Sequence, residues 1–247
     1  MANDAITAQT VMITGHDGDE IEAYAATCHD GASRGGLVVI HHMPGYDRES
    51  KEIVRRFAAA GYNAICPNLY WREAPGAAPD DAAATARASG GVPDERLVGD
   101  VDGAASWLKN LGNSNGKVAT IGYCSGGRQS WLANGSLPLD AAIVCYGAFI
   151  VGKVPEGMPS RPSLEGLAKT MSGPVLGLFG NDDSYPTPEQ VDEIEQHLED
   201  AGKPHEFHRY DGAGHAFFSV DRPSYRPEAA LDGWEKIWAF LGTNLAD

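Results

Sequence analysis

Hydrophobic and polar positions follow two alternating periods from about residue 37 to the end of the chain. Apolar residues recur at helical spacing after Asp47 and again from Asp94. Short apolar runs typical of buried strands separate these helical segments and lie at 37–40, 63–66, 117–122, 141–146, 174–179 and 206–210. Strands that alternate with helices in this way predict right-handed βαβ units and a mainly parallel sheet.

The remaining segments predict other structures. Residues 11–27 indicate an antiparallel hairpin that turns at Asp17 and Gly18. Residues 68–92 are rich in Ala, Pro, Gly and Asp and predict a long loop with at most one helical turn, while 152–172 is broken by Pro and Gly. A closing helix is expected to bury Leu231, Trp234, Trp238 and Leu241. We expect one α/β domain over residues 1–247.

Charge and hydropathy exclude several classes of partner. The 247 residues include 19 Lys and Arg against 34 Asp and Glu, a net charge of −15 without a basic stripe, so nucleic acid would be repelled. The longest apolar stretch, 141–151, is too short to cross a bilayer, and residues 1–10 lack the features of a signal peptide. We expect no membrane association and a cytoplasmic location.

The cysteines and paired histidines do not indicate a metal site. Cys28, Cys66 and Cys145 lie in apolar, strand-like surroundings and are expected to be buried structural thiols. His41 and His42 have no third ligand at metal-binding spacing. We therefore expect no metal site here.

The fourth cysteine lies in a different context. Cys124 follows the strand at 117–122 and precedes a helix, and Gly122 and Gly126 stand two residues before and after it. A nucleophile on a sharp strand-to-helix turn needs these glycines because the chain passes close to itself there. Ser125 is a poorer nucleophile candidate, since Tyr123 occupies the position where a glycine is required.

A cysteine nucleophile needs a base, and the base needs an orienting acid. His215 follows the strand at 206–210 within the sequence Gly-Ala-Gly-His. Two adjacent carboxylates, Asp182 and Asp183, follow the strand at 174–179. The spacing from Gly180 favours Asp183 as the acid and leaves Asp182 as the alternative.

The oxyanion hole would combine two backbone N–H groups. The first belongs to Ser125, directly after the nucleophile, and the second comes from the loop after the strand at 37–40. Pro44 in that loop has no N–H, so Met43 is the expected second donor.

The order and wording of these motifs resemble the dienelactone hydrolase family, whose members are cysteine-nucleophile enzymes of the α/β-hydrolase fold. The resemblance covers most of the chain from Leu37 and includes Cys66-Pro67-Asn68-Leu69-Tyr70, Ser114-Asn115-Gly116-Lys117-Val118 and Ala213-Gly214-His215. It implies an α/β-hydrolase fold and a triad of Cys124, Asp183 and His215. It also implies hydrolysis of an ester or lactone through a thioester acyl-enzyme, without a metal or cofactor.

Two positions differ from the founding type of that family. His42 stands where that type has a glutamate that keeps the cysteine unreactive until substrate arrives. Ser219 stands where it has an arginine that binds the substrate carboxylate, and Arg222 lies at another offset. These differences put carboxymethylenebutenolide itself in question as substrate. The histidine at position 42 also predicts a more reactive resting Cys124.

We expect a hydrolase of small carboxylic esters or lactones. Its substrate pocket is predicted to be walled by His42, Tyr46, Tyr70, Trp71, Tyr123 and Phe217. Two alternatives from other classes are a thiol-based redox sensor or peroxidase that uses Cys124 and a non-catalytic small-molecule binding module on the same scaffold.

Overall fold

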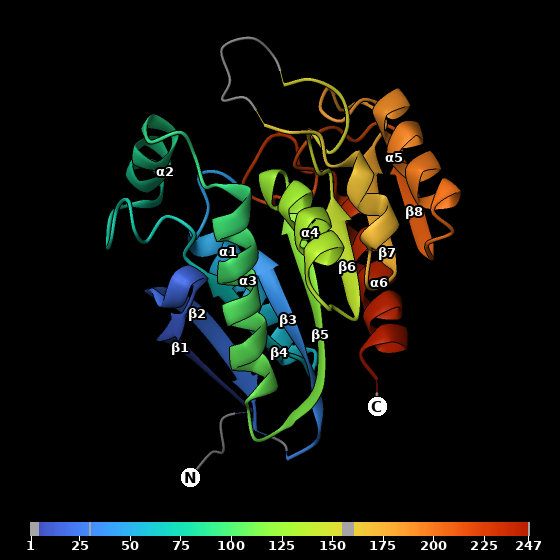
Figure 1. Ribbon diagram of the computed structural model, residues 1–247. Helices are drawn as coiled ribbons and strands as arrows, with labels where there is room; N and C mark the ends of the chain where they lie inside the picture. Colours follow the sequence, from blue (N-terminus) through green and yellow to red (C-terminus); the bar gives the residue numbers. More distant parts are fainter. Residues whose placement is uncertain (1–4, 30, 155–160, 247) are drawn as a thin grey trace. The chain divides into compact units, whose positions relative to one another are not determined.

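The computed structural model describes residues 5–29, 31–154 and 161–246 (Figure 1). Its eight strands form a sheet in the order β1-β2-β4-β3-β5-β6-β7-β8. Strand β1 (Ile6–Thr14) pairs antiparallel with β2 (Glu20–Cys28), in register from Ile6 opposite Cys28 to Thr14 opposite Glu20. The pairs β3–β4, β6–β7 and β7–β8 are parallel. The expected α/β class and the antiparallel N-terminal hairpin are both confirmed.

The chain forms two compact units. Unit 1 comprises residues 1–120 with 245–247, and unit 2 comprises residues 121–244. The expectation of a single domain over 1–247 stays a prediction.

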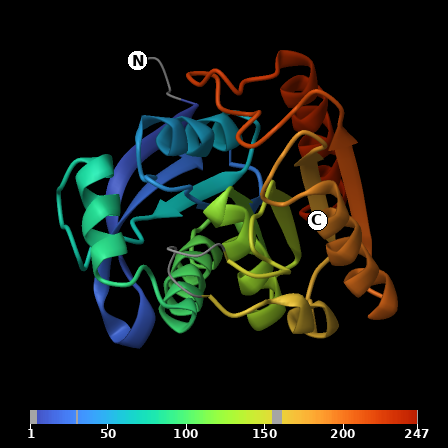
Figure 2. The same ribbon diagram turned by 90° about the horizontal axis from the view of Figure 1, so that it is seen from above.

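In unit 1, helices cover both faces of the strands. Helix α1 (Arg48–Ala59) packs on one face and α3 (Asp94–Lys109) on the other (Figures 1 and 2). Both lie against β3 (Arg34–Ile40) and β4 (Asn63–Pro67), whose side chains are almost entirely buried. This arrangement follows from right-handed crossovers that leave β3 and β4 toward opposite faces.

The start of α1 is fixed by a side-chain cap. The Asp47 carboxylate accepts a hydrogen bond from the Ser50 N–H at 2.9 Å, which satisfies an amide that has no partner within the helix. Val54 and Phe57 then bury one face of the helix. The helix that the apolar spacing after Asp47 predicts is therefore confirmed.

The expectation of a long loop over 68–92 is wrong. Residues Pro79–Ala88 form a full helix, α2. Its Pro at the first turn is preorganised for helix, and the adjacent Asp80 and Asp81 complement the helix dipole. Ala82, Ala83 and Ala86 supply a buried face too small to stand out in a hydrophobic pattern.

Unit 2 is built on β6 (Ala141–Cys145), β7 (Val175–Gly180) and β8 (His205–Tyr210), together with the end of β5 (Ser114–Tyr123). Helices α4 (Ser125–Ser136) and α5 (Pro188–Asp200) lie on one face and α6 (Pro227–Asn244) on the other (Figure 2). A 3₁₀ helix, Glu165–Thr170, lies in the segment that Pro and Gly were expected to break, of which 155–160 lie outside the described residues.

The predicted stripe of α6 is partly wrong. Leu231 is 64% exposed, and the face that packs inward instead consists of Ala230, Gly233, Ile237, Phe240 and Leu241. Trp234 and Trp238 are half-buried and stack on each other, with ring centroids 5.2 Å apart. The prediction gave most weight to the two large indole rings and placed the buried face on their side of the helix. The small residues of the true buried face contribute little to a hydrophobic pattern.

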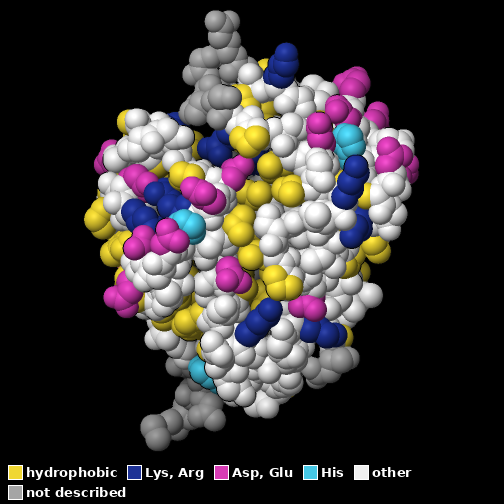
Figure 3. Space-filling view, in the orientation of Figure 1, with side chains coloured by type: hydrophobic (Ala, Val, Ile, Leu, Met, Phe, Trp, Pro, Cys, Tyr) yellow, Lys and Arg dark blue, Asp and Glu magenta, His cyan; other side chains and the backbone are white. Residues whose placement is uncertain are grey.

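The surface and the thiols agree with the sequence analysis where the structure describes them. Cys28, Cys66 and Cys145 are buried, and none of the three takes part in a disulfide bond. On the face drawn in Figure 3, acidic and basic side chains are interspersed rather than gathered into a basic stripe. Among the described residues, no helix combines the length and apolar character that a membrane crossing requires.

A buried ion pair links three parts of unit 1. Asp100 in α3 is fully buried, and both of its oxygens accept hydrogen bonds from the Arg72 guanidinium at 2.9 Å. One of them also accepts the His16 N–H at 2.9 Å, and Arg72 Nε donates to Asp19 at 2.7 Å. These hydrogen bonds, chiefly those to Asp100, raise the pKa of Arg72. The guanidinium thus ties α3 to the turn between β1 and β2.

Replacing Arg72 with Met should lower the free energy of unfolding by about 3–5 kcal/mol, because it leaves the Asp100 carboxylate buried without its counter-charge. Urea denaturation measures the change. The matched control is Arg55→Met, whose carboxylate partner Glu52 is exposed and whose effect should be about 1 kcal/mol or less. Equal effects of the two substitutions would contradict the role given to Arg72.

Candidate active site

The site begins at a sharp turn between β5 and α4, in unit 2. Cys124 is the single residue between Tyr123, the last of β5, and Ser125, the first of α4. Its backbone has φ 56° and ψ −119°, a conformation that costs free energy for a residue with a side chain. Its N–H donates to the Cys145 carbonyl at 3.1 Å, so the end of β6 helps to hold the turn. We call residues 122–127 the nucleophile elbow.

Close backbone contact explains the glycines of the nucleophile elbow. A Cβ on Gly122 would lie 1.8 Å from the Gly126 carbonyl oxygen. A Cβ on Gly127 would lie 2.7 Å from the Cys145 carbonyl oxygen. The backbone segments therefore approach so closely that only glycine, which has a hydrogen in place of a side chain, fits at these positions, as the motif predicts.

The structure brings His215 and Asp183 together. His215 Nδ1 lies 2.8 Å from Oδ2 of Asp183, a buried side chain whose Oδ1 accepts the Tyr185 N–H at 2.9 Å. Asp183 is held in the loop after β7, and His215 lies beyond β8. Asp182, the alternative acid, points its exposed side chain to solvent. The acid–histidine pair is thus the one that the spacing from Gly180 favoured.

Hydrogen bonding sets the protonation of the histidine. Burial acts to lower the pKa of His215, but hydrogen bonds to Asp183 and to Cys124 outweigh burial and raise that pKa to about 10. The imidazole therefore holds its proton at neutral pH between a carboxylate and a sulfur. A cationic imidazole beside a cysteine stabilises the thiolate, which is the nucleophilic form.

Tyr146 is a site residue that sequence reasoning missed. It follows β6 directly, has φ 39°, and presents its ring edge-on to the His215 imidazole with centroids 5.1 Å apart. Phe217, which is fully buried, packs against the Tyr146 ring, with ring centroids 5.3 Å apart. The sequence feature that could have identified Tyr146 is its position directly after a strand. In open α/β sheets, residues at the carboxyl ends of parallel strands collect at the binding site.

In unit 1, the loop that carries Met43 is anchored by His41. The Nδ1–H of His41 donates to the His42 carbonyl at 2.9 Å, and its Nε2 accepts the Leu69 N–H at 3.3 Å. Burial lowers the pKa of His41 to about 4, so the ring stays neutral and both bonds persist at neutral pH. The pairing of the Met43 N–H with that of Ser125 stays a prediction of the sequence.

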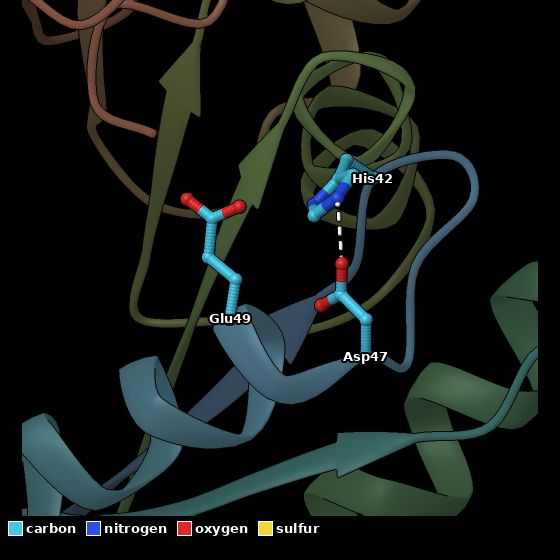
Figure 4. A group of neighbouring side chains, drawn as sticks. All are labelled: His42, Asp47 and Glu49. Carbon is cyan, nitrogen blue, oxygen red and sulfur yellow. Dashed lines mark ion pairs between the residues drawn. The ribbon is translucent and has the colours of Figure 1, made fainter. Parts of the chain in front are cut away.

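His42, Asp47 and Glu49 form a cluster whose ligand atoms all lie within 4.8 Å of one another (Figure 4). Such a set could hold a divalent cation. His42 Nε2 lies 3.1 Å from Asp47 Oδ2, and hydrogen bonds from His42 and Ser50 outweigh burial and hold the pKa of Asp47 well below its ordinary value. Asp47 also caps α1, and Glu49 lies in its first turn, where carboxylates suit the helix dipole. These roles explain the cluster without a cation.

The six residues of the predicted substrate pocket lie in both units. Tyr46 and Tyr70 line a cavity in unit 1, and Trp71 is half-buried. In unit 2, the buried Tyr123 packs against Tyr146 and Phe218, while Phe217 lies among aromatic rings. Their roles as pocket walls stay predictions.

Comparison with known proteins places this chain in a family. The model of the dienelactone hydrolase family matches residues 21–245. A candidate carboxymethylenebutenolidase of Salmonella typhimurium is 36% identical over 228 residues, which are 89% of this chain and 82% of that one. One of Escherichia coli strain K12 is 35% identical over 243 residues, 95% and 86% of the two chains. The chain belongs to the dienelactone hydrolase family.

Solved structures agree with that membership. The crystal structure of a candidate dienelactone hydrolase from Klebsiella pneumoniae is 29% identical and matches with a TM-score of 0.86, over 97% of this chain and 99% of that one. A dienelactone hydrolase-like phosphotriesterase from metagenomic libraries, 19% identical with a TM-score of 0.78, covers 98% of this chain and all of its own. At that identity the second match shows the fold alone.

Ala in place of Gly122 should disrupt the nucleophile elbow, because the added methyl would collide with the backbone at Gly126 rather than with a movable side chain. We expect a loss of about 3 kcal/mol in the free energy of unfolding and altered iodoacetamide labelling of Cys124. Gly166→Ala is the matched control, since nothing lies within 4 Å of its added Cβ. Wild-type stability and labelling in Gly122→Ala would show that the close contact is not needed.

Proposed function

We propose that this dienelactone hydrolase family member hydrolyses small carboxylic esters or lactones through Cys124, His215 and Asp183. The observation that carries the proposal is the chain of contacts within unit 2. Cys124 on the nucleophile elbow is near enough to His215 to raise the pKa of the imidazole, and His215 Nδ1 lies 2.8 Å from the carboxylate of the buried Asp183. Nucleophile, base and orienting acid are the three parts that covalent acyl transfer requires.

The first half of the reaction forms a thioester. The Cys124 thiolate attacks the substrate carbonyl, and the carbonyl electron pair moves onto oxygen to give a tetrahedral intermediate. As the intermediate collapses, the C–O bond to the leaving group breaks, and His215 transfers its proton to the departing alkoxide. In a lactone that alkoxide remains attached to the acyl group. The raised pKa of His215 supports this sequence, because the proton is already on the imidazole when the substrate arrives.

The second half releases the acid and restores the site. The neutral His215 removes a proton from water, and the hydroxide formed attacks the thioester carbonyl. Collapse of this second intermediate expels the Cys124 thiolate and leaves a carboxylic acid, while His215 keeps the proton. Asp183 holds the imidazole in place through Nδ1 and compensates its charge throughout.

Oxyanion stabilisation is proposed for the N-terminus of α4. The Ser125 N–H is the first amide of that helix and directly follows the nucleophile. An amide at a helix N-terminus is oriented before the reaction and carries partial positive charge, so it stabilises an oxygen that becomes negative. Met43 would supply the second N–H.

The relatives' names suggest a substrate class without fixing the substrate. A carboxymethylenebutenolidase acts on an unsaturated lactone that bears a carboxylate, and the candidate relatives carry that name. In this chain Ser219, where the founding type has an arginine, is a buried neutral residue whose N–H donates to Ala216. We therefore assign small esters and lactones as a class rather than that lactone.

A thiol peroxidase is less well supported than a hydrolase. Its sulfenic acid needs a second thiolate for resolution. Cys145 is the cysteine whose backbone contacts Cys124, but it is fully buried, and burial raises the pKa of its thiol well above the ordinary value. The Cys145 thiol therefore keeps its proton.

Rapid mixing with an activated ester should trap an acyl group on the peptide that contains Cys124, detectable by mass spectrometry. Cys124→Ala should lose the adduct and the turnover together, because no other residue supplies the nucleophile. A peroxide-consumption assay on the same protein should stay at background. Full ester turnover by Cys124→Ala would refute covalent catalysis by this residue.

The adjacent aspartates provide a matched pair. Asp183→Asn should lower kcat on the order of 10³-fold or more, and it should move the pKa of His215 down from about 10 toward 6.5, because the negative partner of the imidazolium is removed. Asp182→Asn, which neutralises an exposed carboxylate, should change neither. Ester hydrolysis and NMR titration of the imidazole measure the two effects, and an exchange of behaviour between the variants would overturn the assignment.

A further inference from the structure

Unit 1 contains a cavity of about 440 Å³ that the proposed mechanism does not use. It lies at the start of α1, beside β2 and the segment that follows β4. Its charged lining residues are Glu22, Asp47, Arg48, Lys51 and Arg55. Three cations against two carboxylates give the lining one net positive charge, although the whole chain carries −15.

Two of these cations form no close ion pair among the described residues, and Arg48 interacts with Glu52 only through longer-range charge. Arg55 is bonded to Glu52 and to the Tyr24 hydroxyl, and Asp47 is paired with His42. In the described part of the chain, neither Arg48 nor Lys51 forms an ion pair with a carboxylate. Lys51 instead holds its ammonium 4.2 Å from the centroid of the Tyr46 ring.

A buried hydrogen-bond donor belongs to the same cavity. Tyr46 is 8% exposed and lines the cavity, and its hydroxyl oxygen is buried without a hydrogen-bond partner of ordinary geometry among the described residues. Burial, and a contact of the hydroxyl with the Glu22 carboxylate that falls outside ordinary hydrogen-bond geometry, raise the pKa of Tyr46, so the hydroxyl keeps its proton and can donate to a better-placed acceptor. A buried polar group with an open hydrogen-bond position indicates a missing partner.

Apolar groups complete the lining. Tyr70, Ala77, Pro79 and Ala82 contribute carbon surface from the segment after β4 and from the start of α2. A cavity with apolar walls and a few polar groups is typical of a site for a small organic molecule.

We propose that this cavity binds a small organic monocarboxylate. The carboxylate faces Arg48 and Lys51 and accepts a hydrogen bond from the Tyr46 hydroxyl, while the body of the ligand packs on the apolar wall. One net positive charge matches a monoanion, and the lining carboxylates of Glu22 and Asp47 oppose a dianion such as phosphate. The proposal concerns unit 1 alone and does not depend on Cys124 or on hydrolysis.

Benzoate is a suitable probe, with benzamide as a neutral molecule of nearly the same shape. Calorimetric titration of the wild-type protein should show benzoate binding at least about tenfold more tightly than benzamide. The double variant Arg48→Gln, Lys51→Gln should lose about tenfold or more in benzoate affinity, and Tyr46→Phe should lose part of it. Backbone NMR shifts on titration should cluster at Gly45, Ala77 and Ala82.

Arg56→Gln is the control, because it removes an exposed cation from the same helix outside the cavity and should leave benzoate affinity unchanged. Circular dichroism and thermal unfolding establish that each variant is folded. Equal affinity for benzoate and benzamide, unchanged affinity in the double variant, or shifts confined to unit 2 would overturn the proposal. Inorganic phosphate binding as tightly as benzoate would overturn the assignment to a monocarboxylate.

Discussion

The candidate active site depends on one constraint, the left-handed backbone at Cys124. A strand can pass directly into a helix at that residue only if the chain crosses itself near Gly122, Gly126 and Gly127. Neighbouring interactions stabilise this unfavourable conformation. The Cys124 N–H donates a hydrogen bond to the Cys145 carbonyl, and helix α4 begins at the next residue. Strain at this point places the thiol at the N-terminus of a helix, where negative charge on sulfur or on a substrate oxygen is stabilised.

Sequence reasoning predicted the parts of the candidate site that depend on local chain geometry. The nucleophile elbow could be predicted because close backbone contact requires glycines at fixed offsets from Cys124. The choice of Asp183 over Asp182 also followed from spacing within one loop, and the structure brings Asp183 to His215. Both are short-range properties of the chain, so a pattern of residue types is enough to find them.

What sequence reasoning missed depends on long-range packing or on small residues. Tyr146 meets His215 across 69 positions of sequence, and nothing in its local context marks it. The bond between Arg72 and Asp100 likewise joins a loop to a helix 28 positions away. Helix α2 was taken for a loop because its buried face is made of alanines, whose burial is decided by neighbouring elements rather than by hydropathy.

In the proposed mechanism, the protonated histidine explains why a thiol suits this site better than a hydroxyl. A base with a pKa of about 10 already holds its proton at neutral pH, so it cannot take one from a serine hydroxyl, which remains un-ionised in that range. A thiol loses its proton far more readily, and its sulfur in turn contributes the hydrogen bond that helps to keep His215 charged. The contact with Cys124 is therefore one of the causes of the raised pKa of His215. Asp183, which is buried beside the imidazole, stabilises the cationic member of that pair.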